Sequence, residues 1–149
     1  HTNDAPSTIT RLQNMGTPDY LISAACQLVV AQRLARKNCK KCKIPDDDVN
    51  PKVLQDLGFS AEQASRVKAI KGKGCETCSN TGYKGRQGIY EILVVSKPLK
   101  EAILRKATTP ELRQIAVKEG FQTMQDMGKR LIASGDLNFR EYERVLSNE

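Results

Sequence analysis

The sequence lacks tryptophan and has few aromatic residues of any kind, with three phenylalanines and four tyrosines. A folded core must therefore be built mainly from aliphatic side chains. No run of about 18 apolar residues is present, which argues against a transmembrane helix. The first residues, HTNDAPST, have neither a basic start nor an apolar stretch and do not resemble a signal peptide. Because they also lack an initiating methionine, we expect a piece of a longer protein.

Two kinds of catalytic site are missing as well. The only histidine is His1, and no carboxylate is spaced to complete a three-ligand zinc site with an open position, so a catalytic zinc is not expected. The pattern G-x-x-x-x-G-K-[ST], which cradles nucleotide phosphates, does not occur; the glycine-rich stretches at 72–74 and 82–88 do not match it. On its own, the chain is not expected to hydrolyse a nucleotide.

Acidic residues are absent from one long interval. The chain carries a net charge of +7, and between Asp19 and Asp46 there is no Asp or Glu, whereas six Lys and Arg residues occur there. A second basic cluster lies within residues 66–86. This pattern leaves two interpretations open: local charge compensation with solubility, or an anionic partner such as a phosphate, a nucleic acid or an acidic lipid.

The residues that are present predict an α+β fold that is mostly α-helical. The length of 149 residues fits one modest domain or two small ones. Apolar spacing predicts a helix that ends near residue 15, a longer helix over 18–37 in which Cys26 is a small core residue, and helices from 98 onward. Short helices are expected at 51–57 and 60–67. Strands are expected at 69–71 and 87–95, forming a small sheet with a cysteine loop between them. Capping boxes are predicted at Ser60/Gln63, Thr108/Glu111 and Thr123/Asp126.

Four cysteines form two C-x-x-C pairs, Cys39 with Cys42 and Cys75 with Cys78. This spacing lets a tight turn present both sulfurs to one cation, and four thiolates give zinc a closed, structural site. Neighbouring lysines would offset its negative charge. Other interpretations remain. Two disulfides would need an oxidising compartment, a single redox pair would not explain the second pair, and an iron–sulfur cluster also uses four thiolates.

Four stretches carry a resemblance to a known family. They are HTNDAPSTITRL (1–12), LVVAQRLARKNCKKC (28–42), GCETCSNTGYKGRQGIYEIL (74–93) and GFQTMQDMGKRLIASGDLNFREYERVL (120–146). The first looks like a histidine box, the second and third like two zinc knuckles with a "TGY-x-GR-x-G-I-x-E" continuation, and the fourth like a closing helical subdomain. Together they resemble the C-terminal part of the type II secretion and type IV pilus assembly ATPases, a superfamily of hexameric RecA-like motors.

The resemblance implies an organisation and a set of partners. Residues 1–37 would be the terminal helices of a RecA-like ATPase core, 38–96 a zinc-binding subdomain with a small sheet, and 97–149 a C-terminal helical subdomain. The nucleotide-binding Walker loops would lie upstream, so the full-length enzyme would use ATP with Mg²⁺. It would work as a cytoplasmic homo-hexamer, peripheral to the inner membrane, on a platform protein of a pilus or secretion machine. The pilus extension motor is favoured.

The resemblance also implies roles for single residues. His1 would face the ATP γ-phosphate, Arg86 would lie near the nucleotide and a subunit boundary, and the four cysteines would bind structural Zn²⁺. A planar, always-charged side chain on a glycine-flanked turn suits phosphate or carboxylate. The alternatives are a solvated terminus for His1 and a surface ion pair with Glu91 or Glu76 for Arg86.

A second hypothesis belongs to another functional class. The chain could be a stand-alone zinc-binding module, either chaperone-like or nucleic-acid-binding. Only one such cysteine unit is present, however, and Tyr83 and Tyr90 are too few for a base-stacking platform. No nucleic acid is therefore expected as a partner.

Overall fold

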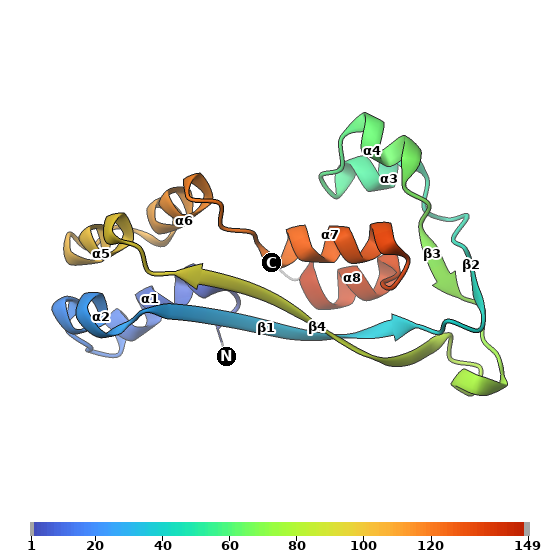
Figure 1. The fold of residues 1–149 in the computed structure, drawn as a ribbon, viewed down its shortest axis with the longest axis horizontal. Coiled ribbons are helices and arrows are strands. Elements are labelled where there is room, and N and C mark those ends of the chain that lie inside the picture. Colours follow the sequence, from blue (N-terminus) through green and yellow to red (C-terminus); the bar gives the residue numbers. More distant parts are fainter. Residues whose placement is uncertain (1, 148–149) are drawn as a thin grey trace. The chain divides into compact units, whose positions relative to one another are not determined.

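The computed structural model describes residues 2–147, which form eight α-helices, one short 3-10 helix and four β-strands (Figure 1). In chain order these elements are α1 (Ala5–Asn14), α2 (Asp19–Ala25), β1 (Leu28–Asn38), β2 (Lys43–Pro45), α3 (Pro51–Asp56), α4 (Ala61–Arg66), β3 (Ile70–Gly72), η1 (Glu76–Cys78), β4 (Tyr83–Val94), α5 (Lys97–Leu104), α6 (Thr109–Lys118), α7 (Met124–Ser134) and α8 (Phe139–Leu146). The α+β class is confirmed. None of the described helices is long and apolar enough to cross a bilayer.

The chain divides into two compact units. The first unit comprises residues 1–32 and 90–124, and the second comprises 33–89 and 125–149. Strands β1 and β4 supply residues to both units. The units therefore cut across the three segments 1–37, 38–96 and 97–149 suggested by the resemblance, and those segments remain a prediction.

Helices α1, α2, α5 and α6 of the first unit pack against one another. Contacts join α2 to α5, α1 to α6, α5 to α6 and α1 to α2. Its core is aliphatic, as the scarcity of aromatics predicts, with Ile9, Leu99, Ile103 and Leu112 fully buried. One buried carboxylate belongs to this core. Glu91 accepts hydrogen bonds from the backbone N–H groups of Ala5 and Met124, at the starts of α1 and α7.

Helix starts follow the predicted capping chemistry. Ser60 caps α4 and Thr108 caps α6, and both capping boxes are complete, with the Gln63 and Glu111 side chains returning to the cap backbone. Asp4 caps α1 through the Ser7 N–H at 2.8 Å. These caps satisfy N–H groups that the first helical turn leaves without intrahelical partners.

The helix predicted over residues 18–37 is wrong in its second half. The helix α2 ends at Ala25, and the chain then enters strand β1, in which buried and exposed side chains alternate. The helix expectation rested on apolar residues at helical spacing. A run with β-branched Val29 and Val30 fits a strand as well, and pairing with β4 decides in favour of the strand.

The predicted pairing of the sheet is also wrong. Segments near 69–71 and 87–95 are indeed strands, but they do not pair with each other. β4 pairs with β1, and the two strands run in opposite directions (Figure 1). β3 pairs antiparallel with β2, with Lys43 opposite Gly72 and Pro45 opposite Ile70. The cysteine loop therefore connects two separate two-stranded sheets.

Two glycines in the second unit allow backbones to approach closely. A Cβ added to Gly72 would lie 2.0 Å from the carbonyl oxygen of Gly82, a distance that no side chain tolerates. In α7, a Cβ on Gly128 would lie 2.5 Å from Leu146 and 2.7 Å from Tyr142 of α8. The first contact holds the segments around the second cysteine pair together, and the second lets α7 and α8 pack closely.

Candidate metal centre

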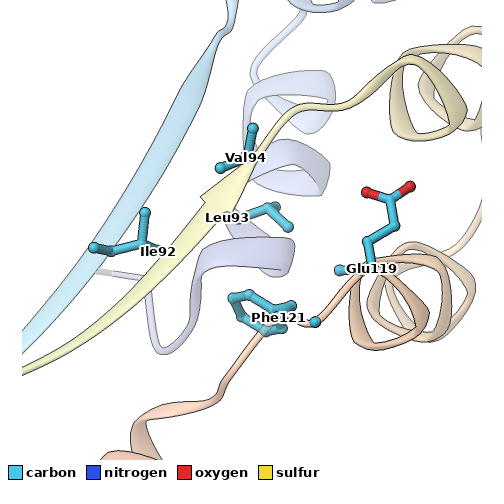
Figure 2. Close-up of a pocket in the computed structure, with 7 residues that line it drawn as sticks. Ile92, Leu93, Val94, Glu119 and Phe121 are labelled. Carbon is cyan, nitrogen blue, oxygen red and sulfur yellow. The ribbon is translucent and has the colours of Figure 1, made fainter.

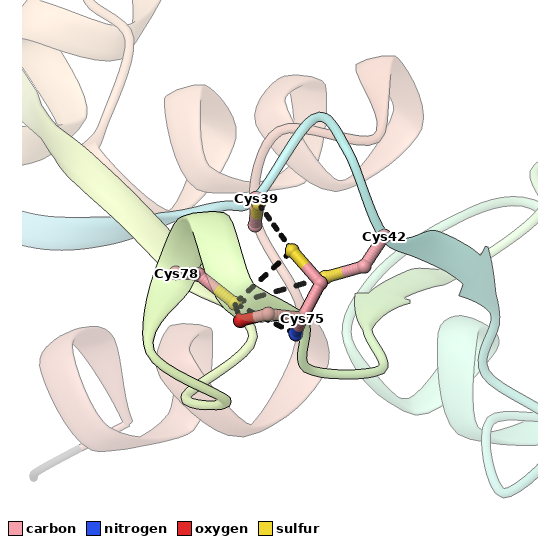
Figure 3. Close-up of side chains that lie close together, drawn as sticks. All are labelled: Cys39, Cys42, Cys75 and Cys78. Carbon is pink, nitrogen blue, oxygen red and sulfur yellow. Dashed lines mark hydrogen bonds between the residues drawn. The ribbon is translucent and has the colours of Figure 1, made fainter.

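The four cysteines of the two C-x-x-C pairs form one cluster in the second unit (Figure 3). Cys39 and Cys42 lie on the turn between β1 and β2, whereas Cys75 directly precedes the 3-10 turn η1 and Cys78 is its last residue. Their sulfur atoms lie within 4.8 Å of one another. The sulfur atoms of Cys39 and Cys75 are 3.8 Å apart, those of Cys42 and Cys78 are 3.9 Å apart, and those of Cys75 and Cys78 are 3.7 Å apart. The structure thus brings together the set that the spacing predicted.

These separations match a single tetrahedral ion. With Zn–S bonds of about 2.3 Å, the edges of a regular tetrahedron of sulfurs are about 3.8 Å long. A disulfide would require about 2.05 Å, and all four cysteines are free thiols in the structure. An iron–sulfur cluster places several iron and sulfide ions between its thiolates, for which this spacing leaves no room. The donor set therefore fits one metal ion held entirely by protein sulfur.

Backbone N–H groups converge on the same sulfurs. Gly74 donates to the Cys42 sulfur at 3.3 Å, and Cys75 and Gly82 both donate to the Cys78 sulfur at 3.2 Å. The turn that makes this possible needs a left-handed backbone at Ser79 (φ 54°) and Asn80 (φ 60°). Such donors stabilise negative charge on sulfur, so the loop is built for thiolates.

The thiols do not share one acidity. Desolvation raises the pKa of Cys78, but the Cys75 and Gly82 N–H groups and the neighbouring thiols lower it to about 6. Desolvation raises the pKa of Cys42 to about 11, and the adjacent cysteines add to this rise despite the Gly74 N–H. Cys78 therefore ionises readily, and its negative charge disfavours ionisation of the neighbouring thiols. A cation at the centre removes that conflict, because a bound metal holds every coordinating thiol deprotonated.

A buried polar network lies beside the cysteines. Asn38, immediately before Cys39, is 1% exposed; its amide N–H groups donate to the carbonyls of Ile70 (3.1 Å) and Gly135 (3.0 Å). Its oxygen accepts from the Asn138 amide at 3.2 Å. The network ties β1, β3 and the start of α8 together. No local sequence pattern points to this pair of asparagines, because the two lie 100 residues apart.

A second network fixes α8 to β1. Glu141 is fully buried and accepts from the Arg36 backbone N–H at 2.8 Å and from its guanidinium at 2.8 and 3.1 Å. Arg144 also pairs with this carboxylate. Desolvation raises the pKa of Glu141, but the hydrogen bonds from Arg144 and Arg36 dominate and lower it to about 2. The Arg36 guanidinium also stacks 4.0 Å from the centre of the Tyr83 ring.

The other predicted residues stand apart from this cluster. Arg86 is exposed on β4 and has no ion pair with another described residue, so the pairing with Glu91 or Glu76 is not formed. His1 lies outside the described residues. Cys26 was expected inside a helix, but it follows the last residue of α2, is half-buried and takes no part in the cluster.

The first unit contains a small depression of a different character (Figure 2). It measures about 120 Å³ and is lined by β4 residues Ile92, Leu93 and Val94 and by the end of α6 with Phe121. Its one ionisable side chain, Glu119, accepts a hydrogen bond from the Ser96 hydroxyl at 2.8 Å. With no nucleophile and no free acid–base pair in its lining, it offers packing rather than chemistry.

Comparison with known proteins places the chain among secretion-system proteins. The family model described as "Type II/IV secretion system protein" matches residues 1–144, which include all four clustered cysteines. The type IV pilus assembly ATPase PilB of Myxococcus xanthus is 37% identical over 141 residues, covering 95% of this chain and 25% of that protein.

Two further relatives extend the comparison. PilB of Thermus thermophilus is 41% identical over 128 residues, covering 86% of this chain and 14% of that protein. The type II secretion system protein HxcR of Pseudomonas aeruginosa is 34% identical over 145 residues, covering 97% of this chain and 27% of that protein. The chain thus spans between 14% and 27% of the length of these relatives. A family match that runs through the cysteine cluster and nearly the whole chain makes this protein a member of the type II/IV secretion system protein family.

Proposed function

We propose that this chain is the C-terminal part of a motor ATPase that powers type IV pilus assembly or type II protein secretion. Its own contribution is a structural zinc centre and one edge of the nucleotide and subunit interface. The observation that carries the proposal is the four-cysteine cluster with tetrahedral spacing inside a segment that the family model covers.

Zn²⁺ is the ion we propose for Cys39, Cys42, Cys75 and Cys78. Zinc favours four-coordinate tetrahedral thiolate sites, and such closed sites stabilise a fold rather than catalyse a reaction. When bound, zinc would supply cross-linking between the β1–β2 turn and the η1 loop. We infer that residues 38–96 work as a zinc-stapled subdomain between the end of a RecA-like core, which includes 1–37, and a helical segment, 97–149.

The nucleotide site would be assembled mostly by residues outside this chain. The sequence contains neither a Walker A nor a Walker B motif, so the isolated chain should not hydrolyse ATP, whereas the full-length enzyme should do so with Mg²⁺. His1 would contribute to the histidine box and Arg86 would reach the nucleotide. The guanidinium of Arg86, which is exposed and has no ion pair with any residue in 2–147, supports this role.

The assembly we propose is a cytoplasmic homo-hexamer at the inner membrane, acting on a platform protein. Relatives named for pilus assembly and for type II secretion both match well, at 41% and 39% identity in two cases. We favour the pilus motor because five relatives, 35–41% identical to this chain, are named as type IV pilus assembly ATPases. Rescue of pilus extension, but not of protein secretion, in strains lacking the respective motor would support this choice.

The experiment that tests the interface role uses the full-length enzyme with Arg86→Ala. ATP turnover should fall at least tenfold, since loss of a charge-assisted contact to phosphate costs roughly 1.5–3 kcal/mol. Zinc content should stay unchanged. Arg66→Ala, which removes an exposed arginine paired with Glu62, is the matched control. Unchanged ATP turnover in the Arg86 variant would show that Arg86 is an ordinary surface residue with no role at the nucleotide.

Salt-sensitive, micromolar binding of nucleic acid to the chain would instead favour the alternative function, a zinc-binding module of another class.

A further inference from the structure

A polar cavity in the second unit has no part in the proposed function. It measures about 210 Å³ and is lined by Asp46, Lys71, Gly72, Thr81, Tyr83, Asn138 and Arg140. These residues come from the position after β2, from β3, from the beginning of β4 with the residue two before it, and from the N-cap and first turn of α8. Pockets for drug-sized ligands usually measure about 300–1,000 Å³. The cavity therefore suits a small ion or the charged end of a larger molecule.

A chain of hydrogen bonds with a fixed direction ends at this cavity. Backbone carbonyls can only accept, so the bonds from Asn38 to Ile70 and Gly135 fix its amide as the donor and leave its oxygen as the acceptor. The Asn138 amide donates to that oxygen, and its second N–H donates to the Tyr83 hydroxyl oxygen at 3.0 Å. Asn138 itself is only 6% exposed.

The fixed direction of these hydrogen bonds determines what the Tyr83 hydroxyl can do. Its oxygen already accepts a hydrogen bond from the Asn138 amide, so its own O–H must donate a hydrogen bond to a different group. No described residue accepts that proton. Tyr83 lines the cavity, and the network thus presents a phenol donor whose acceptor must come from solvent or from a ligand.

The charges that line the cavity favour an anion, which could accept a hydrogen bond from the Tyr83 hydroxyl. Lys71 lies 3.6 Å from Asp46, whose carboxylate also accepts from the Asp48 N–H at 3.3 Å, so this acid is already compensated. Arg140 is exposed and has no hydrogen bond or ion pair with another described residue. It is the second residue of α8, and the positive end of the helix dipole lies at this end of the helix. The lining therefore holds an uncompensated cation and a free hydroxyl donor.

We propose that this cavity binds a small phosphate-type oxyanion through Arg140, Lys71 and the Tyr83 hydroxyl. A tetrahedral oxyanion accepts from a planar guanidinium, an ammonium and a phenol at the same time, and it supplies the acceptor that Tyr83 lacks. The bound group would bridge β3 and α8. Free phosphate and the phosphate ester of a metabolite share this chemistry and are distinguished by the test.

The test is a titration of the zinc-loaded chain followed by ¹H–¹⁵N NMR, with inorganic phosphate, glycerol 3-phosphate and, at matched ionic strength, chloride. Phosphate should shift the Arg140 side-chain signal and the Gly72 and Thr81 amides in a saturable way. Arg140→Gln should weaken binding roughly tenfold, as expected for a charge-assisted hydrogen bond, and Tyr83→Phe about fivefold. Tighter binding of glycerol 3-phosphate than of phosphate would identify an ester as the ligand.

The matched control is Arg130→Gln, which removes an exposed arginine of α7 outside the cavity lining. It should leave the affinity unchanged. Because Arg140 is exposed, its variant should fold, and retained zinc and unchanged thermal unfolding would verify this. Lys71→Gln gives a second, independent reduction in affinity. Equal phosphate affinity in wild type and Arg140→Gln, or shifts reproduced by chloride, would overturn the proposal.

Discussion

The two units of this chain are stabilised by different means. The first unit, with seven Lys and Arg against six Asp and Glu, is nearly neutral, whereas the second has 17 against 11 and carries most of the net charge. The first unit rests on helices that bury aliphatic side chains such as Ile9, Leu99 and Leu112. The second buries four polar or charged residues, Asn38, Asp46, Asn138 and Glu141, in addition to its cysteines.

The difference follows from what each unit has available to bury. Helices α7 and α8 of the second unit bury Ile132, Tyr142 and Leu146, but β2 and β3 have three residues each and α3 and α4 have six each, so that part of the unit has little apolar core. Hydrogen-bonded networks, and the metal ion proposed for the four cysteines, would replace the missing apolar contacts. This arrangement makes the second unit dependent on single groups, whereas the first spreads its stability over many small contacts.

The largest expected effect comes from removing the metal. Zinc binding to structural sites is worth about 10–16 kcal/mol, more than such a unit can lose and stay folded. Chelation, or Cys75→Ser, should abolish hydrogen-exchange protection in β2, β3 and α3 while α5 and α6 remain protected. Exchange mass spectrometry of zinc-loaded and zinc-free chain measures this directly. Equal exchange protection of both units in the zinc-loaded and the zinc-free chain would mean that the second unit does not depend on the metal more than the first.

Glu141→Gln should cost the second unit about 3 kcal/mol, because it leaves two arginines beside a neutral, buried amide. Since the pKa of Glu141 lies near 2, below its ordinary value of 4.5, its contribution is present above about pH 4.5 and is lost as the pH falls toward 2. The gap in unfolding free energy between wild type and variant should close over that range.

Urea denaturation of both proteins at several pH values tests this prediction. Only the difference in unfolding free energy between wild type and Glu141→Gln reports on Glu141, because thiolates of both proteins also take up protons as the pH falls. A gap that is independent of pH would show that the carboxylate is not ionised in the fold.

Ile103→Ala examines the first unit. This side chain of α5 is fully buried, and truncation of such a residue costs about 2–5 kcal/mol. Zinc affinity should not change. A competition titration with a chromogenic chelator, together with calorimetry, separates the two quantities. Weakened zinc binding in this variant would show that the stability of the second unit depends on the core of the first, contrary to this prediction.

The smallest effects should come from one capping box in each unit. Thr108→Ala in α6 and Ser60→Ala in α4 each remove a hydroxyl that accepts an N–H at the helix start, at a cost of about 1 kcal/mol. If the second unit depends on its metal, Ser60→Ala should be unnoticeable while zinc is bound and visible after its removal. Thr108→Ala should have the same effect in both states.

Sequence patterns predicted the local features of both units and missed the contacts between distant residues. The C-x-x-C spacing identified the four ligands, and capping boxes marked two helix starts, because both signals lie within a few residues of chain. Strand β1 was mistaken for a helix because its apolar residues fit both periods, and only pairing with β4 decides between them. The bond between Arg36 and Glu141 joins residues 105 apart, which no local pattern reveals.

The central claim is that one zinc ion bound by four thiolates holds the second unit together. Native mass spectrometry of the purified chain, combined with thiol titration before and after denaturation in chelator, tests it most directly. The account predicts one zinc per chain, with one reactive thiol in the native protein, Cys26, and five after denaturation. A folded, metal-free chain with all five thiols reactive would contradict it.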